Sequence, residues 1–343
     1  MTAGPRLAVV TPLFDARRYI AETVNSILPQ LAPGDEYVVV DDGSRDGSGD
    51  AVRDTLARAP GPIAAQVRLI AQQNQGEAAA VNRGVAEVEA DIVGIVNADD
   101  PILNGLLDEV RAAFATRPEL AAVYPDWLKI DAEGQRIAEI RTYDFDFRVL
   151  LAQHMCIPGP GAFFRRSALQ GEPVRDALAY GISDYDFWLR LGRRGAIIRR
   201  IPAVLATWRL HAQGTTATSQ NGRLAATKIA VIKRFLDLPD LSDEIRALRR
   251  QALSAAFNQA ALVALRGRGV PARRYVIASY ATMLCWPQDV LWHQRRSVPH
   301  LAYAAAQPVS GLLHAALTPL LPARYRRRAV LNQTFRTDVP PSR

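Results

Sequence analysis

The first 125 residues alternate between short β-branched runs and stretches whose apolar residues are spaced as in a helix. The runs that read as strands are 6–12, 36–42, 67–72, 91–100 and 120–125. Between them, apolar residues recur three or four positions apart, which is the spacing of a helix that is buried on one side. Alternation of this kind predicts a mostly parallel, Rossmann-like α/β sheet flanked by helices.

Composition is compatible with a globular fold of this size. The chain has 343 residues, of which 49% are hydrophobic and 22% are charged, so a sizeable core is expected. The two cysteines, Cys156 and Cys285, are far apart, which favours neither a disulfide framework nor a zinc site. The apolar run that precedes Thr11 is too short for a signal-peptide core. We therefore expect a cytoplasmic protein.

The net charge of +8 is unevenly distributed. Residues 220–343 carry 19 Lys and Arg against 6 Asp and Glu, a net charge of +13. Residues 1–219 carry 23 against 28, a net charge of −5. The net negative charge of residues 1–219 argues against a nucleic-acid partner, because sites that bind the phosphate backbone of nucleic acids are usually basic.

The change in charge suggests two parts, a folded domain over 1–219 and a basic, mainly helical extension over 220–343. Helical spacing of apolar residues predicts helices within 224–238 and 244–269. These helices are expected to be packed.

The end of the chain, 300–328, is apolar but is broken by Pro308 and Pro319. No uninterrupted run reaches the roughly 20 residues that a membrane span needs. An interfacial helix on an anionic membrane, a dimer interface and a helical cap all remain open. The basic residues that follow the apolar stretch are Arg324, Arg326, Arg327 and Arg328.

Short polar residues stand at the carboxyl ends of four predicted strands, where ligands bind in parallel sheets. Each group alone reads as an ordinary turn, since Asp, Asn, Ser and Gly are turn residues. When four strands of one sheet all end in such residues, unrelated turns become a weaker explanation and a shared ligand site a stronger one. The groups are Thr11-Pro12, Asp41-Asp42-Gly43-Ser44, Asn74-Gln75-Gly76 and Asp99-Asp100.

Four motifs in this order resemble the nucleotide-sugar domain of family 2 glycosyltransferases. They are "AVVTPLFDARRYIAETVNSILPQ", "VVVDDGSRDGS", "NQGEAAAVNRG" and "VNADD". The resemblance covers roughly residues 6–215. It implies a glycosyltransferase A fold, a nucleotide-sugar donor, a divalent cation and inversion at the anomeric carbon.

The resemblance also implies roles for individual residues. The family's nucleobase contacts map onto Thr11 and Asp42, and its ribose and metal carboxylates map onto Asp99 and Asp100. Pro12, Asn74 and Gly76 stand at the same strand ends and are assigned to the same nucleotide-sugar site.

The adjacent carboxylates of Asp99 and Asp100 predict a binding site for Mg²⁺ or Mn²⁺, and the cation would bridge the phosphates of the donor. Which of Asp99 and Asp100 ligates directly stays open. The chain departs from the family at Asn97, where Asp is common, and Asn97 is either a weaker ligand or a structural cap.

A base for the acceptor hydroxyl is expected at 181–195, where an amphipathic helix begins with Ser183 and Asp184. The family usually reads Glu-Asp here and uses the Asp as base, which maps onto Asp184, with Ser183 in place of the Glu. A plain helix cap is the alternative for Asp184. Asp186 is the weaker candidate for the base and is expected to be solvated.

Two later segments resemble further parts of the family. In "TWRLHAQGTT" at 207–216, Arg209 and His211 are candidates for phosphate or metal contact, although His211 could be an ordinary loop histidine. The segment 157–169 corresponds to the acceptor side.

The sequence therefore predicts an inverting, metal-dependent glycosyltransferase in surface polysaccharide or glycolipid assembly, with a saccharide or lipid-linked acceptor. A sugar-1-phosphate nucleotidyltransferase is one alternative, but "TPLFDARRY" lacks the glycine-rich loop expected there. A non-catalytic nucleotide-sugar-binding or scaffolding protein is another. Asn97 and Ser183 keep that second alternative open.

Overall fold

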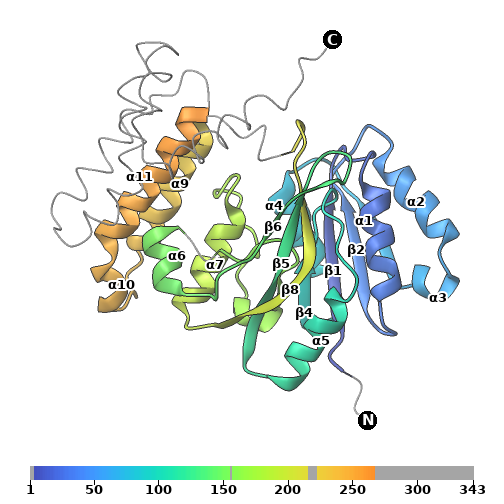
Figure 1. Ribbon diagram of the computed structural model, residues 1–343, viewed down its shortest axis with the longest axis horizontal. Helices are drawn as coiled ribbons and strands as arrows, with labels where there is room; N and C mark the ends of the chain where they lie inside the picture. The colour runs from blue at the N-terminus through green and yellow to red at the C-terminus, as the bar shows by residue number, and fades with distance from the viewer. Residues whose placement is uncertain (1–3, 155–156, 215–221, 267–343) are drawn as a thin grey trace.

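The computed structural model describes residues 4–154, 157–214 and 222–266. Its described part contains one eight-stranded sheet in the order β3-β2-β1-β4-β7-β5-β6, with β8 paired to β5 (Figure 1). The strands are β1 (Leu7–Leu13), β2 (Glu36–Asp41), β3 (Val67–Ala71), β4 (Ile92–Ile95), β5 (Leu120–Ile130), β6 (Arg136–Ile140), β7 (Phe163–Arg165) and β8 (Ile197–Arg209).

The predicted mostly parallel sheet is confirmed. Strands β1 to β4 are parallel to one another, and β8 is parallel to β5. Strands β6 and β7 run antiparallel to the strands with which they pair. The fourth strand is shorter than predicted and ends at Ile95. Residues 97–100 form a turn instead, in which the Asp100 amide donates to the Asn97 carbonyl at 3.2 Å. The two carboxylates therefore stand just beyond the strand.

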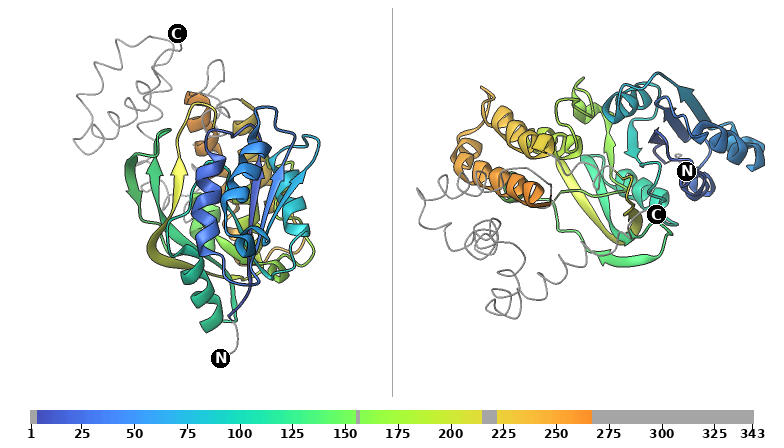
Figure 2. Two further views of the ribbon diagram at one scale, coloured as in Figure 1. Left: turned by 90° about the vertical axis from the view of Figure 1, so that its right-hand side faces the viewer. Right: turned by 90° about the horizontal axis from the view of Figure 1, so that it is seen from above.

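Helices cover both faces of the sheet, as the sequence predicts (Figure 2). One face packs against α1, α2 and α5, and the other packs against α4 and α7. Helices α6, α9 and α11 extend the apolar core on this second side, with α11 packed against α6 and α9. The helices are α1 (Ile20–Ile27), α2 (Ser48–Arg58), α3 (Gly61–Ala64), α4 (Glu77–Ala86), α5 (Leu106–Thr116), α6 (Phe147–Gln153), α7 (Ser183–Arg193), α9 (Gly222–Leu236), α10 (Asp243–Ala247) and α11 (Arg249–Arg266), with short 3-10 turns at Leu28–Gln30 and Arg166–Leu169.

A glycine fixes the position of α4 on the sheet. A Cβ placed on Gly84 would lie 2.3 Å from Cγ1 of Val10 in β1. A side chain there would overlap the strand, so the helix backbone rests directly on β1. The N-terminus of α4 is thereby held beside the carboxyl ends of β1 and β2.

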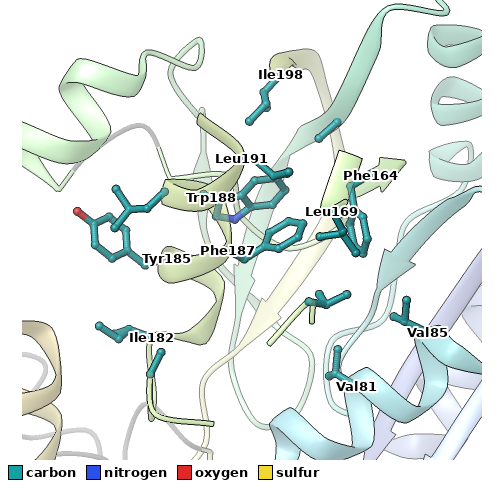
Figure 3. Close-up of a cluster of buried hydrophobic side chains, with 14 of the residues drawn as sticks. Val81, Val85, Phe164, Leu169, Ile182, Tyr185, Phe187, Trp188, Leu191 and Ile198 are labelled. Carbon is teal, nitrogen blue, oxygen red and sulfur yellow. The ribbon is translucent and has the colours of Figure 1, made fainter. Parts of the chain in front are cut away.

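The C-terminal helices share a core with the sheet domain. Val231 and Phe235 of α9 and Ala252 of α11 belong to the same apolar cluster as Phe187 of α7, part of which Figure 3 shows. The predicted helix over 244–269 is divided at Leu248 into α10 and α11. Within the described residues, no helix is long and apolar enough to cross a bilayer.

Some predictions fall on residues outside the described part of the chain. These are the boundary between residues 219 and 220, both cysteines, and the apolar stretch with its prolines and its four arginines, Arg324, Arg326, Arg327 and Arg328.

A half-buried histidine is expected to make the stability of the fold depend on pH. His154 ends α6 in a left-handed conformation with φ of 54°. Its ring centroid lies 4.0 Å from that of Tyr185, and its Nε2 lies 3.4 Å from Nζ of Lys228. Burial, assisted by the Lys228 charge, lowers the pKa of His154 well below its ordinary value. The neutral ring is therefore the folded form.

Below about pH 6.5, His154 binds a proton in the unfolded chain but stays neutral in the folded chain. We expect the free energy of unfolding to fall by up to about 1.4 kcal/mol per pH unit below that point from this group. The variant His154→Asn tolerates the left-handed backbone and lacks the titrating ring, so its stability should depend less steeply on pH. Urea unfolding at pH 7 and pH 5.5 measures both slopes. Equal slopes for the parent and the variant would contradict this account.

Candidate active site

Asp42 ties the end of β2 to the loop before α4. Its Oδ1 accepts hydrogen bonds from Gln72 Nε2 at 2.7 Å and the Gln75 amide at 2.9 Å, and its Oδ2 accepts from the Gly76 amide at 2.7 Å. Asn74 of the same loop is exposed. The structure thus brings Asp42, Asn74 and Gly76 together, as predicted. The Asp42 carboxylate is buried, and both of its oxygens accept hydrogen bonds from the loop.

The end of β1 presents a different set of groups. Thr11 is fully buried, and its hydroxyl shares a 3.1 Å hydrogen bond with Tyr37 Oη. Pro12 pairs with Val40 across the two strands and is half-buried. Phe14 follows the strand and leaves 51% of its surface exposed. Phe14 is therefore an accessible aromatic ring at this edge, and the sequence reasoning missed it.

The two adjacent carboxylates have different environments. Asp100 is buried, and it accepts hydrogen bonds from the Arg209 amide at 2.7 Å and Asn97 Nδ2 at 3.0 Å. Burial, together with the neighbouring charge of Asp99, raises the pKa of Asp100 to about 8. The Asp99 side chain is 26% exposed, and its Oδ2 lies 2.8 Å from His211 Nε2. Asp99 is therefore the accessible carboxylate of the pair, and Asn97 acts as a structural partner of Asp100.

A small cavity beside Asp100 is lined by Asn97, Pro160, Gly161 and Thr207, among others. Its volume is about 20 Å³. That is room for a water molecule and not for a sugar. A larger ligand must therefore lie on the outer side of the pair, where Asp99 is accessible.

Asp99 and His211 are the residues that could hold a divalent cation. They offer one carboxylate oxygen and one imidazole nitrogen at 2.8 Å from each other. No group of three or more metal-binding side chains occurs among the described residues. Mg²⁺ and Mn²⁺ are commonly held by one or two protein ligands while phosphates and water complete the shell. The donor set fits a cation of that kind that is shared with a diphosphate.

Arg209 is buried, with 1% of its side chain exposed. Its Nη2 pairs with Glu22 Oε2 at 2.6 Å, and its Nε donates to the Asp99 carbonyl at 2.8 Å. Its Nη1 lies 3.3 Å from the Asp131 carbonyl and 3.4 Å from the Ala132 carbonyl. The guanidinium thus joins α1, the turn after β4 and the β5–β6 hairpin. In this arrangement Arg209 positions Asp99, and the predicted phosphate contact stays a prediction.

Arg209→Lys should lower the free energy of unfolding by about 1–3 kcal/mol, because an ammonium group cannot reach all these acceptors and leaves buried carbonyls without partners. The matched control is Arg18→Lys. Arg18 pairs with Glu133 at 3.0 Å, with 61% and 64% of the two side chains exposed, and an exposed pair contributes little. Chemical denaturation of both variants measures the difference. Equal effects would contradict the positioning role.

Asp184 is the second residue of α7 and is exposed. Its Oδ1 accepts from the Tyr185 amide at 2.7 Å, and it forms no ion pair within the described residues. Asp186, in contrast, is buried between Arg190 Nε at 2.9 Å and Arg234 Nη2 at 3.0 Å. The prediction that Asp186 is solvated is therefore wrong, because these two guanidinium groups compensate its burial. Asp184 is the carboxylate that a ligand can reach.

The loop over 172–182 is fixed on both sides. Asn82 of α4 donates from Nδ2 to the Arg175 carbonyl at 2.7 Å and accepts from the Arg175 amide at 2.9 Å. Arg190 of α7 pairs with Glu172 at 3.1 Å. The start of α7, with Asp184, is thus held against α4.

Glu77 and Arg175 are two further residues that the sequence reasoning missed. Glu77 is the first residue of α4 and is accessible. Loss of hydration among the surrounding groups raises its pKa; the charge of Arg175 opposes this shift, and those of Asp184 and Asp99 add to it. Asp99, Glu77 and Asp184 are therefore close enough to interact. We call these three carboxylates the acidic edge.

The segment at 157–169, which the sequence predicts to lie on the acceptor side, packs on a tryptophan. A Cβ on Gly159 would lie 2.5 Å from Trp127 Nε1. Trp127 in turn packs edge-on against Trp208 with ring centroids 5.4 Å apart, and Lys129 Nζ lies 5.3 Å from the Trp208 ring centre. This pair of indole rings borders the segment at 157–169, and no sequence motif indicated it.

Comparison with known proteins identifies the part of the chain that carries Asp42 and Asp99, whereas Asp184, Arg209 and His211 lie beyond the matched residues. The sequence model described as Glycosyl transferase family 2 matches residues 8–172. Residues 8–172 are a family 2 glycosyl transferase domain. The chain is also 32% identical over 140 residues to the O-antigen biosynthesis protein RfbC of Myxococcus xanthus, and 26% identical over 212 residues to the chondroitin synthase of Escherichia coli.

These matches cover 40% and 62% of this chain but 11% and 30% of the two relatives. The chain therefore spans less than a third of either relative.

The family 2 domain has the fold of solved glycosyltransferases. The structure of S. aureus TarS 1-349 in complex with UDP-GlcNAc is similar with a TM-score of 0.63 at 16% identity, over 88% of this chain and 91% of that one. The mannosyltransferase PcManGT from Pyrobaculum calidifontis, in complex with GDP-Man and Mn²⁺, is similar with a TM-score of 0.55 at 20% identity, over 89% and 87% of the two chains. The predicted glycosyltransferase A fold is confirmed.

Proposed function

We propose that this chain transfers a sugar from a nucleoside diphosphate sugar to a hydroxyl acceptor, with inversion and with the help of Mg²⁺ or Mn²⁺. The observation that carries the proposal is the acidic edge. Asp99, paired with His211, and Asp184 come from different elements, and the negative charges of both raise the pKa of Glu77. This arrangement offers one carboxylate for the leaving diphosphate and another for the attacking hydroxyl.

In this proposal Asp184 takes the proton of the acceptor hydroxyl. The hydroxyl oxygen forms a bond to the anomeric carbon while the bond from that carbon to the diphosphate oxygen breaks. Asp184 is suited to this role because it is exposed and has no ion pair within the described residues.

Asp99 and His211 would hold the divalent cation, which when bound offsets the negative charge that develops on the leaving diphosphate. Arg209 keeps Asp99 in place by donating to its carbonyl. His211 Nε2 faces Asp99 Oδ2 at 2.8 Å, and its Nδ1 is buried without a hydrogen-bond partner among the described residues.

The nucleotide would lie across the ends of β1 and β2. The loop that Asp42 organises presents Asn74 and Gly76, and Thr11 and Pro12 border it from β1. The half-exposed Phe14 offers a flat apolar surface against which a base can stack. Asp42 acts in this proposal by shaping the loop.

The acceptor is proposed to be a saccharide or a lipid-linked sugar in polysaccharide assembly. The names of the relatives, O-antigen biosynthesis protein and chondroitin synthase, support that class. Trp127 and Trp208 border the acceptor-side segment, and aromatic rings often line carbohydrate sites because they bury apolar faces. With a lipid-linked acceptor, the basic extension over 220–343 would face an anionic membrane surface.

The alternatives are not favoured by the comparisons. The matched family and the similar structures are glycosyltransferases, which does not support a sugar-1-phosphate nucleotidyltransferase. The accessible Asp99 and Asp184 speak against a non-catalytic binding protein.

A thermal-shift panel tests the proposed function. UDP-, GDP- and dTDP-sugars are added to the full chain with Mn²⁺ and, separately, with a chelator. A ligand at 100 times its Kd adds about 2.7 kcal/mol to the stability, so at least one nucleotide series should raise the melting temperature, and more so with Mn²⁺. No shift with any nucleotide would contradict the proposal.

A further inference from the structure

One arginine of α9 contacts the chain on both sides of Asp184, the carboxylate that acts as the base in the proposed function. Arg234 Nη2 lies 2.7 Å from Asp176 Oδ2 and 3.0 Å from Asp186 Oδ1. Asp176 belongs to the loop over 172–182, which leads into α7, and Asp186 follows Asp184 within the helix. A single guanidinium nitrogen therefore joins the loop to the start of α7.

Hydrogen bonds continue this contact along the loop. Asp176 Oδ1 accepts from the Leu178 amide at 2.8 Å. The Ile182 amide donates to the Ala179 carbonyl at 2.9 Å, and the Asp186 amide donates to the Ile182 carbonyl at 3.1 Å. The backbone that leads into the base is thus ordered from the middle of the loop to the first turn of the helix.

The second oxygen of Asp186 is held from within α7. Asp186 Oδ2 lies 2.9 Å from Arg190 Nε, and the Arg190 guanidinium also donates to the carbonyls of Pro173 and Val174 at 2.9 and 3.0 Å. Arg190 thus holds the beginning of the loop, and Arg234 holds its middle. When Arg234 is replaced, the buried Asp186 carboxylate keeps Arg190 as its counter-charge.

Apolar contacts hold α7 and α9 together independently of these charges. Ile182 and Tyr185, which flank the base in sequence, lie in the apolar cluster of Figure 3. Val231 and Phe235 of α9 belong to the same cluster. The Arg234 side chain is 41% exposed, and exposed ion pairs contribute little to stability. Loss of the Arg234 charge should therefore leave the helices packed and release mainly the loop.

We propose that Arg234 is a positioning residue for the base, so that α9 contributes to the active site. The inference rests on the proposed function, because it takes Asp184 as the base. By tying Asp176 to Asp186, Arg234 limits the orientations that the Asp184 carboxylate adopts. A base held in one orientation needs no reordering before it takes the acceptor proton, and a small misplacement slows such a step.

This contact lies outside the part of the chain that matches the family. The matched residues, 8–172, contain neither Asp184 nor Arg234. The inference therefore assigns a role in the reaction to a helix that the family resemblance does not cover.

Arg234→Gln and Arg234→Lys test this role, because both contacts come from one nitrogen, Nη2. The ammonium nitrogen of lysine can serve two carboxylates in its place, whereas a neutral amide cannot compensate them. Release of nucleoside diphosphate from UDP-glucose, UDP-GlcNAc and GDP-mannose is measured with Mn²⁺ on the full chain, with water as the acceptor whose proton the base takes. For the active donor we expect kcat to fall about tenfold in Arg234→Gln with KM unchanged, and Arg234→Lys should recover most of the rate.

Amide hydrogen exchange tests the same contact without turnover. In Arg234→Gln the amides of Leu178 and Ile182 should exchange faster than in the parent, while those of β1 should exchange at the parent rate. A loss of general stability would instead raise exchange throughout α9 and lower the melting temperature.

Lys233→Gln is the matched control, because Lys233 is the exposed neighbour of Arg234 in α9 and forms no ion pair within the described residues. It removes the same charge and should leave kcat, KM and the exchange of the loop as in the parent.

Asp176→Asn removes the contact from the other side. Its Oδ1 can still accept from the Leu178 amide, but the ion pair with Arg234 is lost, so kcat should fall as in Arg234→Gln. Because the two variants remove one shared contact, the double variant should lose less than the product of the two single effects.

A parent value of kcat, or parent exchange of the loop, in folded Arg234→Gln would overturn the inference. If Arg234→Gln failed to fold, a parent value of kcat in Asp176→Asn would overturn it instead. In either case the proposed function stands as long as Asp184→Asn is slow. A parent rate in Asp184→Asn, or no release of nucleoside diphosphate from any donor, would contradict the proposed function, and the inference would fail with it.

Discussion

Asp184→Asn is expected to lower the rate of sugar transfer by about 10²- to 10⁴-fold, because the amide has nearly the same shape but cannot take the acceptor proton. Donor binding should remain, since Asp184 is exposed and forms no ion pair within the described residues. Calorimetry of nucleotide binding, together with steady-state transfer rates, separates the two quantities.

The control for this prediction is Asp186→Asn in the same helix. Asp186 is buried between Arg190 and Arg234, so its neutralisation leaves two guanidinium groups uncompensated and should lower stability instead. Asp184→Asn should melt at the parent temperature, and Asp186→Asn should melt lower. If Asp184→Asn lost donor affinity while transfer at saturation stayed unchanged, Asp184 would not be the base.

Asp99→Asn should reduce turnover by about 10²-fold or more and weaken the response to Mn²⁺, because the charge on the leaving diphosphate would be poorly compensated. His211→Ala should act in the same direction, since Nε2 lies 2.8 Å from Asp99 Oδ2. Turnover is measured as a function of Mn²⁺ concentration, and Mn²⁺ binding is measured separately by electron paramagnetic resonance.

Asp108→Asn is the matched control, because Asp108 is exposed in the first turn of α5 and its loss removes the same charge. Its Mn²⁺ dependence should equal that of the parent. Full activity of Asp99→Asn in the presence of a chelator would contradict the proposal that Asp99 binds a metal ion needed for turnover. Asp100→Asn is expected to affect stability as well, because Asp100 is buried and accepts from Arg209 and Asn97.

Local sequence was sufficient to predict much of the sheet. β-branched runs such as that around Val38 form buried strands because successive side chains fill the two faces of the sheet. The polar residues that end these runs, such as Asp42, lie at one edge because the carboxyl ends of parallel strands meet there.

The rest depends on contacts between distant parts of the chain. Asp99 and Asp100 are adjacent in sequence, yet an amide at Arg209 decides which of them is buried. Strands β7 and β8 were not predicted, because β7 has three residues and β8 is interrupted by charged residues.

Arg175 could not be assigned from sequence, since its place depends on the side chain of Asn82. Glu77 could have been noticed, because it follows directly on the motif that gave Asn74 and Gly76. A negatively charged residue at the start of a helix, next to a predicted ligand site, was the signal by which Glu77 could have been found.

The configuration of the glycoside that the enzyme forms tests the central claim, a single displacement between Asp99 and Asp184, most directly. An α-linked donor found in the nucleotide panel is incubated with Mn²⁺ and its acceptor, and the product is analysed by NMR through the coupling of the anomeric carbon to its proton. The account predicts a β-glycoside, because Asp184 activates the acceptor on the face opposite the leaving diphosphate. An α-glycoside would contradict it.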